Sequence, residues 1–355
     1  MTSISVKMGS NTISVFHPFE QPSNFYLKEI EKHFDGFFRF GNINDSVKEA
    51  DIIHIHWPEA LYNWKEPGEG SIQELEDKII FWKEKFKIIY TRHNEEPHHG
   101  GSKKFSSLYN LVEQAADGII HLGRYSHQQF INNRPDLKNV QHVIIPHPIY
   151  TLYPNNISSK EARQKLNLKE QDKIILCLGN IRNKEESIFL RKVFQQVSIK
   201  HKILVAPTMD YYVNGWSNKV LSRLNQIVFR SIYAVHPRYR FENRFLEDDA
   251  LQVYLNAADC LFIPRLRSLN SGLLLLGMSF GIPVVCSHTG NNTEVIEESH
   301  AYGYESGNIQ SAAQAIEDAM NKTHSPVPTL FLEERSPSRI ATLYHSFCTQ
   351  LINGV

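Results

Sequence analysis

Short apolar runs rich in β-branched residues alternate along this chain with longer windows in which apolar residues recur at helical spacing. The runs predict strands at residues 13–16, 52–56, 87–91, 118–121, 142–145, 173–178, 203–206, 260–263 and 283–286. Windows such as 71–86, 185–197 and 248–257 predict helices between them. This alternation is typical of βαβ units, in which helices cover both faces of a parallel sheet, so we expect an α/β fold.

A segment near the middle of the chain interrupts this pattern. Residues 146–159, PHPIYTLYPNNISS, hold three prolines and show no hydrophobic period, which is typical of a linker. The chain of 355 residues is also long enough for two domains of roughly 150 to 200 residues each. We therefore predict one Rossmann-like domain at 1–150, a second at 151–335, and a last helix at 336–355 that opens with SPSRI.

Charge and cysteine content narrow the class of protein. Lysine plus arginine equal aspartate plus glutamate at 38 each, so no net field attracts nucleic acid or an anionic bilayer. The four cysteines are widely spaced and mostly lie in apolar runs, which favours reduced, buried thiols. The N-terminus lacks the apolar core of a signal peptide, and the apolar stretch 272–286 is broken by glycines and a proline. We therefore expect a cytoplasmic protein.

Polar clusters follow the strands of the first half. HIHWPE at 54–59 leaves one strand with its two histidines on the same face, and RHNEEPHHGG at 92–101 follows the next strand. A third cluster, PHPIY at 146–150, follows a later one. Ligands of open α/β folds bind at the carboxyl ends of the strands, so we expect these clusters to line a cleft between the two domains.

Packing and metal binding are the alternatives for these residues. A histidine within a strand, such as His54, is more often a hydrogen-bonded core residue than a ligand, and Trp57 with Pro58 could serve packing as readily as sugar stacking. A His-x-His pair with further histidines downstream would also suit a metallohydrolase barrel. Such a barrel requires eight repeated βα units, whereas this chain breaks and restarts, so we predict no metal site.

The second half carries signals for an anionic ligand. LCLGNIRNKEE at 176–186 predicts a strand, a glycine turn and a helix start, where backbone amides and two cations would hold a diphosphate. In the stretch 259–296, NSG opens another helix behind a basic loop, and a further polar turn precedes a glutamate. The alternative is that the serine only caps its helix and that the arginines are solvated. The donor-binding candidates are Gly179, Arg182, Lys184, Arg265, Arg267, Asn270, Ser271, Gly272 and Glu294.

Four blocks in this order resemble those of the GT-B sugar-nucleotide glycosyltransferases, especially the bacterial exopolysaccharide branch that includes the β-mannosyltransferase of xanthan assembly. They are HIHWPE at 54–59, HNEEPH at 93–98, GNIRNK at 179–184 and the stretch 264–284, which contains NSGLLLLG. The resemblance spans nearly the whole chain. It implies two Rossmann-like domains facing each other across a cleft, an N-terminal acceptor domain, a C-terminal nucleotide-sugar domain and a last helix that crosses back to the first domain.

The resemblance also implies an activity. It indicates a hexosyltransferase of cell-surface polysaccharide assembly, with GDP-mannose as the favoured donor, UDP-hexoses next, and a saccharide or lipid-linked oligosaccharide as acceptor. Peripheral contact with the inner face of the cytoplasmic membrane belongs to the same expectation. Commoner retaining enzymes carry a Glu-x7-Glu motif, and Leu269 and Gly277 stand at the corresponding positions here, which favours inverting transfer. No convincing loop offers an Asp-x-Asp pair for magnesium, so we expect metal-independent transfer without a cofactor.

Inverting transfer requires a group that takes the proton of the acceptor hydroxyl. The catalytic candidates are Glu59, His93 and Glu95, and the first two rank higher because Glu95 is no part of the matching pattern. Residues expected on the acceptor side are His56, Trp57, Asn94 and His98. Three other classes stay open from the sequence: a non-hydrolysing sugar-nucleotide epimerase of the same fold, a metal-dependent hydrolase, and an inactive sugar-binding protein.

Overall fold

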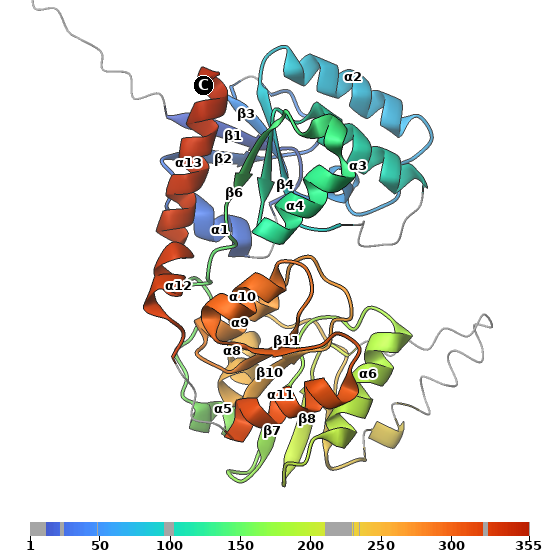
Figure 1. Cartoon of the computed structure of the whole chain (residues 1–355), viewed down its shortest axis with the longest axis vertical. Helices are drawn as coiled ribbons and strands as arrows, with labels where there is room; N and C mark the ends of the chain where they lie inside the picture. The colour runs from blue at the N-terminus through green and yellow to red at the C-terminus, as the bar shows by residue number, and fades with distance from the viewer. Residues whose placement is uncertain are drawn as a thin grey trace, which may run out of the picture. The chain divides into compact units, whose positions relative to one another are not determined.

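The chain divides into two compact units (Figure 1). The computed structural model describes residues 12–21, 25–47, 49–95, 103–209, 229, 231–233, 235–321 and 326–354. Unit 1 comprises Met1–Pro146 with Pro337–Val355, and unit 2 comprises His147–Ser336. Each unit is an α/β structure built on a parallel sheet, as the hydrophobic pattern predicts.

Unit 1 contains, within its described part, a parallel sheet of six strands in the order β2-β1-β3-β4-β5-β6. The strands are β1 (Ile13–His17), β2 (Gly36–Phe40), β3 (Ile52–Ile55), β4 (Lys87–Arg92), β5 (Gly118–His121) and β6 (Gln141–Ile144). The helices are α1 (Phe25–Glu31), α2 (Ser71–Lys83), α3 (Lys103–Ala115), α4 (Arg124–Asn133) and α13 (Pro337–Asn353), and 3-10 turns span Pro58–Tyr62 and Pro135–Leu137.

Helices pack on both faces of this sheet, which explains why its central strands are apolar on both sides. Tyr26 of α1 and Phe347 of α13 belong to the core on one face. Trp82 of α2 and Leu108 of α3 belong to the core on the other face. At Gly118 in β5, a Cβ atom would lie 2.6 Å from the Phe347 ring, so this glycine permits the close approach of α13.

Unit 2 repeats the architecture, with six described strands in the order β12-β11-β10-β7-β8-β9. The strands are β7 (Lys173–Leu176), β8 (Lys202–Ala206), β9 (Tyr239–Phe241), β10 (Cys260–Ile263), β11 (Val284–Ser287) and β12 (Tyr302–Tyr304). The helices are α5 (Ser159–Lys165), α6 (Lys184–Gln196), α8 (Asp248–Ala257), α9 (Gly272–Ser279), α10 (Asn292–Ser299), α11 (Ile309–Asn321) and α12 (Thr329–Glu334).

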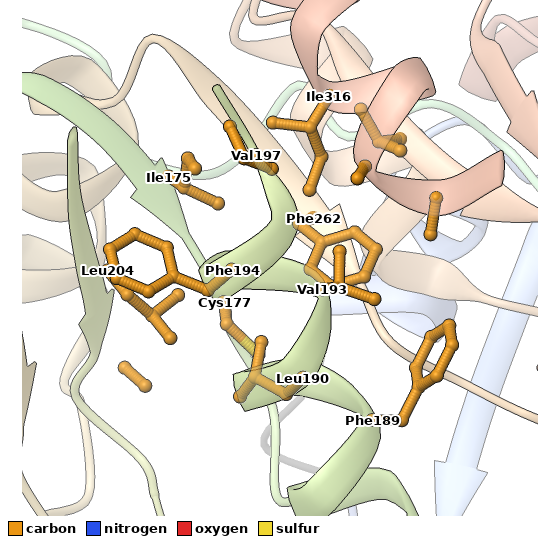
Figure 2. Packing of buried hydrophobic residues seen from close by; sticks show 14 of the residues in the cluster. Ile175, Cys177, Phe189, Leu190, Val193, Phe194, Val197, Leu204, Phe262 and Ile316 are labelled. Carbon is orange, nitrogen blue, oxygen red and sulfur yellow. The ribbon is translucent and has the colours of Figure 1, made fainter. Parts of the chain in front are cut away.

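The core of unit 2 fixes the position of α6. Figure 2 shows Leu190, Val193 and Phe194 of this helix packed with Ile175 and Leu204 of the sheet. These α6 side chains recur at helical spacing, so the amphipathic face of the sequence is the face that is buried. The N-terminus of α6 is thereby held just beyond the end of β7.

All nine predicted strands are confirmed, with ends that agree within two residues, but the sequence pattern did not predict three others. These three strands, β2, β9 and β12, lie at the edges of their sheets. An edge strand is less enclosed than a central one and needs no continuous apolar run, so its sequence signal is weak. The predicted helix at 71–86 is shorter than expected and ends at Lys83 as α2.

The cysteines agree with the expectation of reduced, buried thiols. All four cysteines are buried and unpaired. Among the residues that the structure describes, no helix combines the length and the apolarity needed to cross a membrane.

Candidate functional site

The end of β7 in unit 2 leads into a glycine turn and then into α6. Gly179 adopts a φ of 78°, in the left-handed region that strains other residues, so the chain can turn sharply here. The Asn183 side chain then accepts a hydrogen bond of 2.9 Å from the backbone N–H of Glu186 and caps α6. The predicted strand, turn and helix start of this segment are therefore present.

The Glu186 carboxylate forms ion pairs with two of the predicted donor-binding arginines. Its side chain is only 1% exposed, and Arg265 Nη1 lies 2.6 Å from Oε2. Arg182 donates from Nε and Nη2 to Oε1, at 3.0 and 2.8 Å, and from its backbone N–H to Oε2. Burial alone would raise the pKa of the Glu186 carboxyl, but the nearby guanidiniums of Arg265 and Arg182 outweigh burial and hold this pKa below its ordinary value. Glu186 is therefore an anion that orients both arginines.

The first turn of α9 meets the same glycine turn. A Cβ atom at Gly179 would lie 3.0 Å from the Leu273 side chain and 3.4 Å from Arg265 Nη2. Ser271 precedes α9, and its side chain makes no capping hydrogen bond. The alternative that Ser271 serves only as a helix cap is therefore wrong. The structure brings Gly179, Arg182, Arg265 and the start of α9 together.

The segment PHPIY contributes to this site as well. A Cβ atom at Gly272 would lie 2.9 Å from the Tyr150 hydroxyl and 3.6 Å from His147 Nε2. His147 Nδ1 lies 2.7 Å from the backbone oxygen of Pro148 and therefore donates to it, so Nε2 is the acceptor for the Tyr150 hydroxyl at 3.3 Å. Burial lowers the pKa of His147 to about 4, which keeps the imidazole neutral at pH 7.

The remaining donor-binding candidates occupy different positions in unit 2. Asn270 accepts a hydrogen bond of 2.7 Å from Asn291, which ties the loop before α9 to the turn before α10. Arg267 has an exposed side chain, and its backbone oxygen accepts from Arg182. Lys184 is exposed at the first position of α6, and Glu294 lies in the first turn of α10.

Unit 2 also contains a larger cavity of about 600 Å³, lined by residues of α5 and by Asp259. Asp259 directly precedes β10, so this cavity lies at the amino end of the sheet. Ligands of such folds bind at the carboxyl ends of the strands, so the cavity is not the candidate site.

In unit 1, buried histidines gather where β1, β3 and β4 end. His56 Nδ1 lies 3.0 Å from His93 Nε2, and Trp57 stacks on His93 with ring centroids 4.4 Å apart. His54 bonds Tyr344 through Nδ1 and Thr91 through Nε2, so it is the satisfied core histidine that the packing alternative predicts. Burial, with neighbouring histidines as a smaller cause, lowers the pKa of His54 and of His56 well below the ordinary value.

The three catalytic candidates differ in access. Glu59 is fully buried and accepts a 2.8 Å hydrogen bond from the Tyr109 hydroxyl, so in this conformation it is closed to an acceptor and supports its turn. His93 is 8% exposed, and Glu95 is exposed. Asn94 is half-buried and also bonds Tyr109. His98 lies outside the described residues.

Among the described residues, His17, His54 and His56 form the group that could hold a metal ion, with one ligand atom of each within 4.8 Å of the others. Their arrangement does not fit an ion, because both nitrogens of His54 are engaged in hydrogen bonds. The rings of His54 and His56 also lie 3.9 Å apart, closer than imidazoles that splay around one tetrahedral ion.

Sequence reasoning gave no role to several residues of these sites. Glu186 and the pair His147 and Tyr150 stood in segments that the sequence singled out, so a signal for them existed. His17 and Tyr109 carried no such signal, because their partners in space are far along the chain.

Residues 172–322 match a protein family described as glycosyl transferases group 1, and this span contains the arginine pair and α9. No curated protein matches the chain. HepE from Anabaena in complex with UDP-glucose has a TM-score of 0.65 at 14% identity, over 97% of this chain and 100% of that chain. Sucrose-phosphate synthase from Thermosynechococcus elongatus has a TM-score of 0.61 at 16% identity, with the same coverage. The catalytic domain of starch synthase IV from Arabidopsis thaliana, bound to ADP and acarbose, has a TM-score of 0.55 at 12% identity, over 86% of this chain and 74% of that chain.

At these identities the solved structures establish the fold. They confirm the predicted GT-B class of α/β architecture. Together with the family match, they confirm the prediction of a glycosyltransferase and do not favour the epimerase or the hydrolase. The xanthan branch and GDP-mannose stay predictions.

Proposed function

We propose that this protein transfers a hexose from a nucleoside diphosphate sugar to a hydroxyl group of a saccharide, with unit 2 binding the donor and unit 1 supplying the acceptor side. One observation carries the proposal: Arg182 and Arg265 are fixed on the buried Glu186 carboxylate, beside the Gly179 turn.

Donor binding follows from the charges at this turn. Arg182, Arg265 and the exposed Lys184 supply three positive charges against the carboxylates of Glu186 and the exposed Glu185, so one positive charge remains in excess for a diphosphate. The Arg182 side chain is 47% exposed and keeps guanidinium N–H groups at the surface. Because Glu186 already orients the arginines, little rearrangement is needed when negative charge builds on the leaving diphosphate.

The start of α9 would contribute further donors to the same anion. Its first-turn amides carry the positive end of a helix dipole, and the Ser271 hydroxyl is not used as a helix cap. Because Gly272 has no Cβ atom, the Tyr150 hydroxyl can lie close to the start of this helix. These groups stabilise a diphosphate without a metal ion, as we propose for this enzyme.

Proton transfer is assigned to the histidine pair of unit 1. When His93 donates from Nε2 to His56 Nδ1, the His93 Nδ1 carries the lone pair that accepts the acceptor proton. His56 would then hold the tautomer and the orientation of His93, as the third member of a catalytic triad does. Glu95 is the second candidate for this role, because Glu59 is enclosed.

The donor is a GDP- or UDP-hexose in this proposal. The sequence blocks favour GDP-mannose and an inverting transfer in exopolysaccharide assembly at the membrane face. HepE, a structure of the same fold, is in complex with UDP-glucose. Both nucleotides therefore enter the test.

The test is a thermal-shift panel of GDP, UDP, ADP and dTDP, followed by incubation of the protein with the matching sugar nucleotide. A ligand at 100 times its Kd adds about 2.7 kcal/mol of stability, so a bound nucleotide raises the melting temperature clearly. Arg265→Ala should abolish the shift. Arg39→Ala should keep it, because Arg39 is ion-paired with Glu49 at the surface of unit 1. A panel without any shift, and no release of nucleotide from any sugar donor, would refute the proposal.

An epimerase needs no acceptor, so the same incubations separate it from a transferase. Conversion of a sugar nucleotide to its epimer in the absence of any saccharide would favour the epimerase. Release of the nucleoside diphosphate that accelerates with an added saccharide supports transfer.

A further inference from the structure

A cavity in unit 1 opens beside the turn that follows β3. It has a volume of about 240 Å³ and is lined by Phe19, Glu20, Trp57, Ala60, Asn63 and Trp64. Sites for drug-sized ligands span about 300 to 1,000 Å³, so this cavity suits one sugar ring better than a whole nucleotide sugar.

Two indole rings define the apolar part of this cavity. The ring centroids of Trp57 and Trp64 lie 6.0 Å apart at an angle of 44°. The Trp57 ring stacks on His93, which holds it in place, whereas the Trp64 side chain is 43% exposed. A tryptophan ring that lines a cavity offers a ligand a large, rigid apolar surface at low cost in conformational entropy.

The backbone places Trp64 at an energetic cost. Asn63 and Trp64 have φ values of 52° and 63°, so two consecutive residues other than glycine adopt the left-handed conformation. Hydrogen bonds from their backbone N–H groups to Ala60 and Glu59 hold them there, at 3.1 and 2.9 Å. Asn63 adopts this conformation readily as the C-cap of its turn, whereas for Trp64 the strain is of order 1 to 3 kcal/mol, and such strain concentrates at functional sites.

Polar groups stand at the rim of the same cavity. The carboxylate of Glu20 can accept hydrogen bonds, and the amide of Asn63 can both donate and accept them; both side chains are exposed. A pyranose combines an apolar C–H face with a rim of hydroxyl groups. The lining of the cavity has the matching combination.

We propose that this cavity is a subsite for one pyranose ring of the acceptor saccharide, with Trp57 and Trp64 against the C–H face of the ring and Glu20 and Asn63 on its hydroxyl groups. The assignment rests on the proposed function, because it names where in unit 1 the acceptor binds.

A binding experiment tests the subsite without any donor. The full chain is labelled with ¹⁵N-indole tryptophan, and the indole signals of Trp57 and Trp64 are assigned from Trp57→Phe and Trp64→Phe variants. It is then titrated with methyl β-D-glucopyranoside, methyl α-D-mannopyranoside and cellobiose. We expect saturable shifts of both signals with at least one sugar, while Trp82 in the core stays unchanged. No shift of either signal with any of the three would overturn the proposal.

Variants give a second measurement. Loss of about 55 Å² of apolar contact corresponds to a tenfold weaker Kd, so Trp64→Ala should weaken sugar binding about tenfold and Trp64→Phe should restore most of it. Phe81→Ala, which removes an aromatic ring of similar exposure on α2, should change nothing. Equal binding by Trp64→Ala and the unaltered protein would also overturn the proposal. Nucleotide binding by unit 2 is measured separately in the thermal-shift panel, so either proposal can fail alone.

Discussion

His17 gives a test of the histidine cluster that needs no substrate. Its side chain is fully buried, and neither ring nitrogen has a hydrogen-bond partner among the described residues. It packs on Phe19, Phe38 and Phe40 and faces His54 and His56 at 5.3 Å. Burial lowers the pKa of His17 to about 3. A backbone contact with His54 offsets this only in part, and its geometry falls outside that of a hydrogen bond.

The sign of the pH dependence follows from this lowered pKa. Between about pH 3 and 6.5 the unfolded chain binds one more proton at His17 than the folded chain does. The contribution of neutral His17 to stability is therefore complete above pH 6.5 and is lost as the pH falls. One pKa unit corresponds to 1.36 kcal/mol, so acidification from pH 8 to pH 5.5 removes about 1.4 kcal/mol of unfolding free energy through this residue.

The perturbation is His17→Phe, which keeps an aromatic ring and removes both unpaired nitrogens. At pH 8 the free energy of unfolding should change by less than about 1 kcal/mol, because the lost polar atoms made no hydrogen bond. From pH 8 to pH 5.5 the variant should gain about 1.4 kcal/mol relative to the unaltered protein. His54 and His56 have lowered pKa values as well, so the variant still loses stability in acid.

The assay is urea unfolding followed by tryptophan fluorescence at pH 8.0, 7.0, 6.0 and 5.5. Trp57, Trp64 and Trp82 lie in unit 1 and only Trp216 belongs to the other unit, so the signal reports mainly on the unit that contains His17. His33→Gln, at an exposed position, controls for removal of a histidine. Parallel stability curves for His17→Phe and the unaltered protein would refute the reasoning. A loss above about 3 kcal/mol at pH 8 would also refute it, because the nitrogens would then have a partner whose removal is costly.

Three further predictions concern the candidate sites. Glu186→Gln should lower the free energy of unfolding by about 2 kcal/mol or more in urea, since it leaves Arg265 without its anion, whereas Glu185→Gln on the exposed side of α6 should stay within about 0.5 kcal/mol. Gly179→Ala should cost about 1 to 2 kcal/mol because of its φ of 78°, and calorimetric titration should show weaker donor binding; unchanged values would contradict the role of the turn. His93→Gln should lower kcat for transfer by about 10²- to 10⁴-fold while the nucleotide-induced thermal shift persists, and an unchanged kcat would leave Glu95 as the base.

The central strands of both sheets could be predicted because they are buried on both faces, and apolar runs as short as 52–56 or 260–263 are typical of such strands. The edge strands could not be predicted with the same pattern. In the site, the strand-end histidines and the basic turns were visible in the sequence. Which of them are accessible was not, because the enclosure of Glu59 depends on Tyr109, which lies 50 residues further along the chain.

Glu186 combines one role that could be predicted from the sequence with another that could not. Asn183 followed three residues later by a glutamate is a recognisable helix start, so a local role for Glu186 at the N-terminus of α6 could be predicted from spacing alone. Its side chain accepts from the backbone N–H of Arg182, one residue before the N-cap Asn183, so the reciprocal bond of a capping box is not formed. Its contact with Arg265, 79 positions later, depends on β7 and β10 being neighbours in the sheet. Local spacing therefore places Glu186 in the first turn of α6. The strand order makes it the anion that orients both donor-site arginines, which is why removing its charge should affect stability and donor binding together.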